Sequence, residues 1–186
     1  MKKVLVLTAH PDDLELACGG TVARFVDEGV EVTNLIVCSN VPHKKYVPES
    51  SKILGFNPLY LEHRDESITR EVVAEIEALI DISSYDLLIT HWKEDWHQDH
   101  RFCHDLGNSL RRKQPLNVWY MNAYPYCQKY TSFDANVFVD ITKYIEQKKN
   151  SILCYKNVPT KWAKDTEHLT AYRGAFIETQ HAEIFK

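Results

Sequence analysis

Short apolar runs along the chain alternate with longer segments in which apolar residues recur every three or four positions. Aliphatic and β-branched runs predict strands at residues 3–8, 30–37, 59–61, 86–90, 117–121 and 137–140. Helical spacing predicts helices at residues 19–28, 49–54, 71–82, 99–112 and 142–155. Strands that alternate with helices indicate βαβ units. We therefore expect an α/β fold, a Rossmann-like, three-layer α/β/α arrangement around a mainly parallel sheet.

Composition is consistent with a single domain over residues 1–186, because no repeat or Gly/Ser-rich linker divides the chain. The net charge is −4, whereas domains that bind nucleic-acid backbones usually have a pI above about 9, so no nucleic-acid partner is expected. The apolar run 4–7 is too short for a signal peptide or a transmembrane segment. Five cysteines without a C-x-x-C pair indicate reduced, packed thiols. We expect a cytoplasmic protein.

Two clusters of titratable residues follow predicted strands. His10, Asp12 and Asp13 come directly after the first strand, and the segment 97–100, His-Gln-Asp-His, follows the strand at 86–90. Ligands of open α/β sheets bind outside the carboxyl ends of the strands. Both clusters are therefore expected at one edge of the sheet, as parts of one site.

The residue types in these clusters are those of a metal centre. Two adjacent carboxylates repel each other and normally need a cation unless water solvates them. A His and a carboxylate from one strand end, with a His from another, give the open coordination set of a catalytic zinc site. Fe²⁺ or another divalent ion would fit the same set. The local alternatives are an exposed Asx turn for the first cluster and a solvated helix N-terminus capped by Asp99 for the second.

Roles for the remaining groups follow from their positions. The side chains of Asp12 and Asp13 diverge, so Asp12 is left to act as the general base for the zinc-bound water. His97 lies three positions before His100 and could stabilise the oxyanion or help to protonate the leaving amine.

The loop that carries the second cluster contains further candidates. Asp95 or Asp99 could hold the imidazole that acts on the oxyanion in the required tautomer, and His91 lies at the strand end near the site. Trp96 offers an aromatic face for a sugar ring. Trp92 and Trp96 could equally be core residues of a long loop.

The segments AHPDDLELACGGT (9–21) and DWHQDHRFC (95–103) together resemble the PIG-L / LmbE-like family of zinc-dependent N-acetylglucosaminyl deacetylases. Weaker similarity extends over nearly the whole chain, through 140–142 and 182–185. The resemblance implies the following site residues: His10, Asp13 and His100 as zinc ligands, Asp12 as general base, His97 beside the tetrahedral intermediate, and Asp65 as a ligand of sugar hydroxyls, with its neighbour Arg64 added as a candidate.

We therefore expect a metal-dependent hydrolase that removes the N-acetyl group from a free, nucleotide-linked or glycosidic amino sugar. One alternative is a related amidase or esterase that acts on an acylated antibiotic or a thiol–sugar conjugate. Another is a non-catalytic module that binds sugars or nucleotides, although no G-x-G-x-x-G follows the first strand. The aromatic stretch 119–130 could line the pocket or form the contact of a homo-oligomer.

Overall fold

The structure is a computed structural model that describes residues 1–63, 70–113, 115–125 and 133–186. Within these residues the strands form one sheet in the order β3-β2-β1-β4-β5-β7-β6. The strands are β1 (Lys3–Thr8), β2 (Glu31–Ile36), β3 (Asn57–Tyr60), β4 (Leu87–His91), β5 (Asn117–Met121), β6 (Val137–Asp140) and β7 (Ala182–Phe185). The pairs from β3 through β5 are all parallel, whereas β7 pairs antiparallel with both of its neighbours, β5 and β6. The mainly parallel sheet predicted from the sequence is confirmed.

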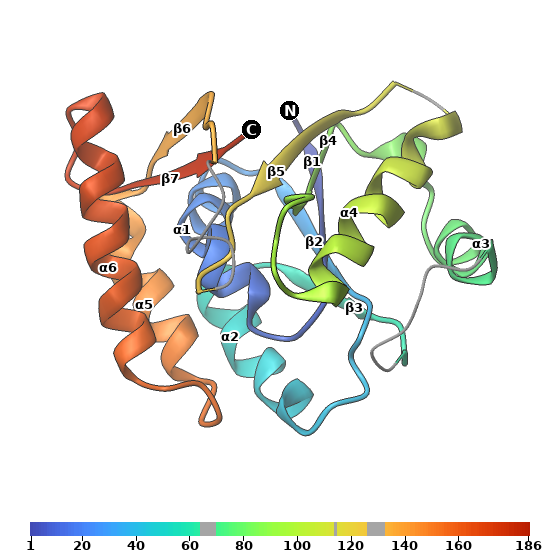
Figure 1. Ribbon diagram of the computed structural model, residues 1–186, viewed down its shortest axis with the longest axis horizontal. Coiled ribbons are helices and arrows are strands. Elements are labelled where there is room, and N and C mark those ends of the chain that lie inside the picture. Colours follow the sequence, from blue (N-terminus) through green and yellow to red (C-terminus); the bar gives the residue numbers. More distant parts are fainter. Residues whose placement is uncertain (64–69, 114, 126–132) are drawn as a thin grey trace.

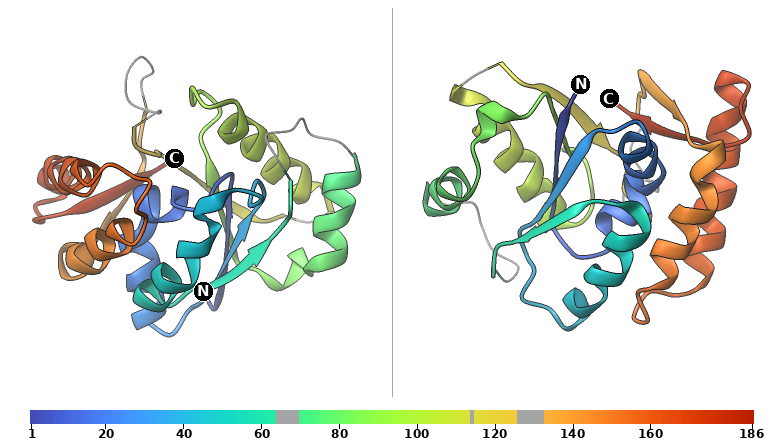
Figure 2. Two further views of the ribbon diagram at one scale, coloured as in Figure 1. Left: turned by 90° about the horizontal axis from the view of Figure 1, so that it is seen from below. Right: turned by 180° about the vertical axis from the view of Figure 1, so that it is seen from behind.

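Helices cover both faces of this sheet (Figures 1 and 2). They are α1 (Asp13–Asp27), α2 (Val47–Leu54), α3 (Arg70–Leu79), α4 (Gln98–Leu110), α5 (Ile145–Leu153) and α6 (Lys161–Gly174). One layer contains α1, α2, α5 and α6, and the other contains α3 and α4. The three-layer expectation is therefore also confirmed. Across the described parts of the chain, no helix combines the length and the apolar character that a membrane span needs.

Strand β1 shows why a central strand carries a continuous run of apolar residues, here Val4 to Leu7. Val4 and Val6 belong to the hydrophobic cluster beneath α1, whereas Leu5 and Leu7 belong to the cluster beneath α4. A strand that is covered on both faces needs apolar residues at every position, not at alternate ones. The continuous apolar run in the sequence therefore indicates a central strand.

Two parts of the fold differ from the sequence expectation. The first helix begins at Asp13 and not at Gly19, because its first turns carry the buried side chains of Leu14 and Leu16. Helix α6 and strand β7 were not predicted from the pattern. The sequence of α6 is mostly polar, and β7 is only four residues long, so neither gives a clear periodic signal.

Helix α1 is kinked at Cys18, whose φ of −137° and ψ of 18° are not helical. Lys148 of α5 donates hydrogen bonds of 2.8 and 3.0 Å to two backbone carbonyls before the kink. Glu183 of β7 accepts hydrogen bonds of 3.0 and 2.6 Å from two backbone N–H groups after it. The two side chains form an ion pair of 2.6 Å and are both fully buried. Segments distant in sequence therefore satisfy the backbone groups that the kink leaves open.

Replacing Lys148 by Met should destabilise the protein by about 3–5 kcal/mol, because the variant leaves the carboxylate of Glu183 buried without its cation. Urea unfolding measures this change in the free energy of unfolding. Lys149 is the matched control, since its ion pairs with Glu146 and Glu167 are partly exposed and its replacement by Met should cost at most about 1 kcal/mol. Equal effects of the two substitutions would contradict the structural role assigned to Lys148.

Candidate metal centre

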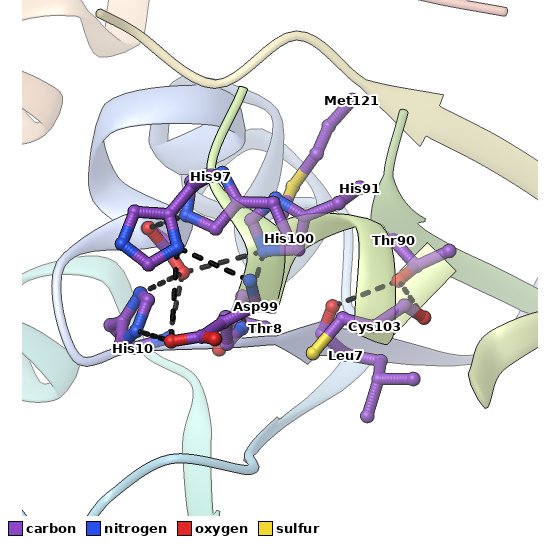
Figure 3. Close-up of polar contacts among 12 residues, drawn as sticks. Leu7, Thr8, His10, Thr90, His91, His97, Asp99, His100, Cys103 and Met121 are labelled. Carbon is purple, nitrogen blue, oxygen red and sulfur yellow. Dashed lines mark hydrogen bonds and ion pairs between the residues drawn. The ribbon is translucent and has the colours of Figure 1, made fainter. Parts of the chain in front are cut away.

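The two titratable clusters lie together at the carboxyl edge of the sheet (Figure 3). His10 follows β1, and His91 ends the neighbouring strand β4. Helix α4 begins at Gln98, and His97 is its N-cap residue. The expectation that the two clusters face one site is therefore met by the parallel pairing of β1 with β4.

Asp13 is the centre of the arrangement. Its Oδ1 lies 3.1 Å from Nε2 of His100, and its Oδ2 lies 3.6 Å from Nδ1 of His10. The backbone N–H of His10 donates a further hydrogen bond of 2.7 Å to Oδ2. The side chain of Asp13 is 7 % exposed, so the first cluster is not an exposed Asx turn. One carboxylate thus lies between two imidazoles whose ring centroids are 5.6 Å apart, one in the loop after β1 and the other in the first turn of α4.

Two more imidazoles border this point. His97 packs edge-on against His10, with ring centroids 4.7 Å apart, and stacks on His100 at 4.9 Å. His91 stacks on the opposite side of His100 at 4.0 Å, and its Nε2 lies 3.3 Å from Oδ2 of Asp13. His97 and His91 are therefore close enough to influence any group held by the central three residues.

Two buried carboxylates contact ring nitrogens of His100 and His10. Oδ2 of Asp95 lies 2.9 Å from Nδ1 of His100, which leaves Nε2 directed at Asp13. Oδ2 of Asp99 lies 2.8 Å from Nε2 of His10. Carboxylates in such positions set the tautomer and orientation of metal-ligating histidines. The contacts have the form expected around a metal centre.

The sequence offered Asp95 or Asp99 as the partner of the His97 imidazole, and a solvated cap at Asp99 as an alternative. Oδ2 of Asp99 lies 3.7 Å from Nδ1 of His97. Asp95 contacts the imidazole of His100 and not that of His97, whose backbone N–H it accepts at 2.8 Å. Asp99 is not a solvated helix cap: its side chain is 2 % exposed and faces His10. The cap is His97, whose Nδ1 accepts the backbone N–H of Asp99 at 3.3 Å.

The carboxylates and imidazoles of the site shift one another's pKa values. Burial alone would lower the pKa of His10, but Asp13 and Asp99 raise it to about 10. Burial also lowers the pKa of His100, but Asp13 and Asp95 outweigh this effect and raise that pKa to about 9. The pKa of Asp13 is held well below its ordinary value by neighbouring histidines, against the effect of burial. The carboxylates thus hold protons on two imidazoles, and a divalent ion can supply that positive charge instead.

Asp12 has an unusual backbone. Its φ of 97° lies in the left-handed region, which for a residue other than glycine costs of order 1–3 kcal/mol and is concentrated at functional sites. Burial, then the charges of Asp13 and Glu15, raise the pKa of Asp12 well above its ordinary value. Asp12 is therefore a strained, partly buried carboxyl beside the central cluster.

A pocket of about 320 Å³ opens onto these residues. Asp12, His97 and the three central residues line it. Its wall also contains residues that the sequence reasoning did not single out: Leu16, Val41, His43, Asn157, Val158 and Trp162. These residues come from α1, from the segment after β2 and from the segment around the start of α6, and no local pattern connects them. Tyr124 is a further wall residue, from the aromatic stretch for which a pocket wall was one expectation.

The remaining candidates lie elsewhere. Trp96 is 49 % exposed and is not among the residues that line the pocket. Trp92 is buried and packs against the rings of Tyr120 and Phe133, so the core interpretation of this side chain is the right one. Arg64 and Asp65 lie outside the described residues, as does the part of the aromatic stretch from 126 to 130.

Comparison with known proteins identifies relatives of this chain. A model of the family described as PIG-L, GlcNAc-PI de-N-acetylase, matches residues 5–110. Diacetylchitobiose deacetylase of Thermococcus kodakarensis is 23 % identical over 98 % of this chain and 82 % of its own length. An uncharacterized deacetylase of Escherichia coli, YaiS, is 27 % identical over 53 % of this chain, and the match spans 62 % of that protein.

Solved structures show that this fold occurs in proteins that catalyse different reactions. The conserved protein TT1542 of Thermus thermophilus superimposes with a TM-score of 0.85 at 24 % identity, over 100 % of this chain and 94 % of its own. The 4-carboxy-2-hydroxymuconate hydratase GalB of Pseudomonas putida gives a TM-score of 0.86 at 14 % identity, over 100 % and 95 %. At these identities the superpositions establish the fold and leave the reaction to be argued from the site.

Proposed function

Since the chain belongs to the PIG-L family of deacetylases, we propose that it is a metal-dependent hydrolase that releases acetate from an N-acetylated amino sugar. One observation carries the proposal: Asp12 lines the same pocket as His10, Asp13 and His100. A site of this kind has both a place for a cation and a separate carboxylate that can move a proton. The relative diacetylchitobiose deacetylase is named for an N-acetylated sugar, which supports this class of substrate.

His10, Asp13 and His100 are the residues we assign to the metal, and zinc is the ion that two imidazoles and one carboxylate suit best. The buried position of Asp13 and the contact of His100 with Asp95 fit this assignment. When bound, zinc polarises the acyl carbonyl and lowers the pKa of a bound water to about 7. Fe²⁺ would fit the same residues.

Asp12 and His97 are the side chains to which we assign the proton transfers and the stabilisation of the oxyanion. Asp12 accepts a proton from the water that attacks the acyl carbon, and returns it to the amine nitrogen as the C–N bond breaks. The products are the free amine and acetate. Nδ1 of His97 accepts a backbone N–H, so its neutral imidazole carries the proton on Nε2. That N–H is the donor we assign to the developing oxyanion.

Trp162 is the aromatic face that we assign to the sugar ring. It lines the pocket and packs edge-on against Tyr124, with ring centroids 5.7 Å apart. Trp162→Ala should raise KM about tenfold, which corresponds to about 1.4 kcal/mol, with a smaller change in kcat. Steady-state kinetics measure both constants. Trp96→Ala is the matched control because Trp96 lies away from the pocket wall; a KM effect confined to Trp96→Ala would restore the original sequence prediction.

The test of the proposed function is amine release from a panel of acylated compounds. Protein stripped by a chelator and reloaded with one zinc per chain is assayed against free, β-linked and nucleotide-linked N-acetylglucosamine, and against N-acetylated amines without a sugar. We expect release from the sugars only, and only after reloading. Release from the non-sugar amides alone would favour the amidase alternative. No release by fully loaded protein would refute the proposal.

A further inference from the structure

His43 is a pocket residue to which the function proposed above assigns no part. It lies in the short 3₁₀ helix η1 (Pro42–Tyr46), which follows β2, and it lines the same pocket as the metal centre. The imidazoles of His10, His97 and His100 also line this pocket, and each contacts a carboxylate or a backbone N–H through a ring nitrogen. Within the described part of the chain, no hydrogen bond or ion pair engages a ring nitrogen of His43. One polar side chain of the pocket wall is thus left for a ligand.

The backbone around His43 is held in place by its neighbours. Pro42 is the first residue of η1, where the fixed φ of proline is compatible with a helical turn. Lys44 forms an ion pair with Glu62, and its Nζ lies 4.3 Å from the centre of the Tyr60 ring. The imidazole of His43 is therefore presented to the pocket from an anchored segment, and a hydrogen bond to a ligand requires little further ordering.

The imidazole of His43 is neutral at neutral pH. Burial, and then the nearby charge of His10, lower its pKa below the ordinary value of 6.5, while Asp13 opposes this shift. A neutral imidazole carries one N–H donor and one nitrogen acceptor, and a hydroxyl can both donate and accept a hydrogen bond. His43 therefore suits a hydroxyl better than a phosphate or a carboxylate, for which a cationic side chain is the stronger partner.

The position of His43 indicates which part of a sugar it meets. Val41 and His43 line the pocket from the segment after β2, whereas Val158 and Trp162 line it from the segment around the start of α6. Trp162 is the residue that we assign to the face of the sugar ring. The hydroxyls of a pyranose project from the edge of its ring. A side chain from another wall segment is therefore placed to contact this edge while the indole contacts the face.

We propose that His43 is a specificity-determining residue, which forms a hydrogen bond with a hydroxyl of the sugar ring and favours N-acetylated sugars over acylated amines that lack this hydroxyl. The inference rests on the proposed function, because that function places an amino sugar in the pocket. A site that hydrogen-bonds a substrate hydroxyl rejects analogues without it, since the polar group of the protein is then left unpaired. The bond is present before and during the reaction, so it affects KM more than kcat.

Two substitutions separate hydrogen bonding from packing at this position. His43→Phe removes both hydrogen-bonding nitrogens and keeps a ring of similar size, whereas His43→Gln keeps a donor and an acceptor. His43→Phe should lower kcat/KM for N-acetylglucosamine about tenfold, mainly through KM, and His43→Gln should recover most of this loss. Steady-state kinetics with the 1-, 3-, 4- and 6-deoxy forms of the sugar locate the contact. For one of these analogues, the wild-type and His43→Phe proteins should have equal kcat/KM.

His168→Phe is the matched control, because His168 is exposed on α6 and is not among the residues that line the pocket. This variant should keep the wild-type kcat/KM. Near-ultraviolet circular dichroism and zinc content show that each variant is folded and loaded. If His43→Phe matched the wild-type protein on N-acetylglucosamine, or lost the same factor on the sugar and on every deoxy analogue, the proposal would be overturned.

A binding measurement separates this inference from the proposed function. Calorimetry gives the Kd of N-acetylglucosamine for zinc-loaded Asp12→Asn protein, in which turnover is suppressed, and for the same protein with His43→Phe added. We expect the Kd to be about tenfold higher in the double variant. If this difference is found although the wild-type protein hydrolyses no sugar, the proposed function fails and the role of His43 stands. Equal Kd values, or no binding of the sugar to either protein, would refute the role of His43.

Discussion

Asp12→Asn should lower kcat by about 10²–10⁴-fold, the usual contribution of a general base, while the protein keeps one zinc per chain. The amide has nearly the shape of the carboxylate but accepts no proton under these conditions. Asparagine also tolerates the left-handed backbone region, so the φ of 97° at this position should be retained. Rates measured on the preferred substrate, with zinc content determined on the same samples, test this expectation.

Asp27→Asn provides the control for this substitution, because Asp27 is exposed at the other end of α1. We expect it to leave both kcat and zinc content unchanged. A variant at Asp12 that turns over at a near-normal rate with full zinc would show that the base has been assigned to the wrong residue. A variant that loses zinc would instead place Asp12 among the ligands.

His100→Gln should abolish zinc binding and hydrolysis together, because His100 supplies one of the three assigned ligands and is 1 % exposed. Asp95→Asn should give a milder effect, a decrease in zinc affinity of about 10–100-fold, since Asp95 acts through Nδ1 of His100. Competition against a chelator of known affinity measures both changes. The two variants therefore separate a ligand from the residue that orients it.

His104→Gln is the control on the same helix, one turn after His100. Nδ1 of His104 lies 3.1 Å from the backbone carbonyl oxygen of His91, and we assign it no contact with the metal. This variant should keep wild-type zinc affinity. If His100→Gln bound zinc as tightly as His104→Gln, His100 would not be a ligand.

Strands β1, β2 and β4 were predicted well because each is a short, buried segment rich in aliphatic and β-branched residues. The joint position of the His10 and His100 clusters followed from the same runs, since parallel strands direct their carboxyl ends to one edge. The first helix was placed six residues too late. Its true beginning at Asp13 and its kink depend on Lys148 and Glu183, which are far away in the sequence.

The sequence by itself determined the donor types, the parallel sheet and the edge where the clusters meet, because periodicity and loop position are properties of a few adjacent residues. Only the tertiary structure decided that Asp95 contacts His100, and that His43 and Trp162 reach the pocket. These contacts join loops from different strands and helices. They depend on how the elements pack and on which rotamers the packing allows, and no local pattern encodes either.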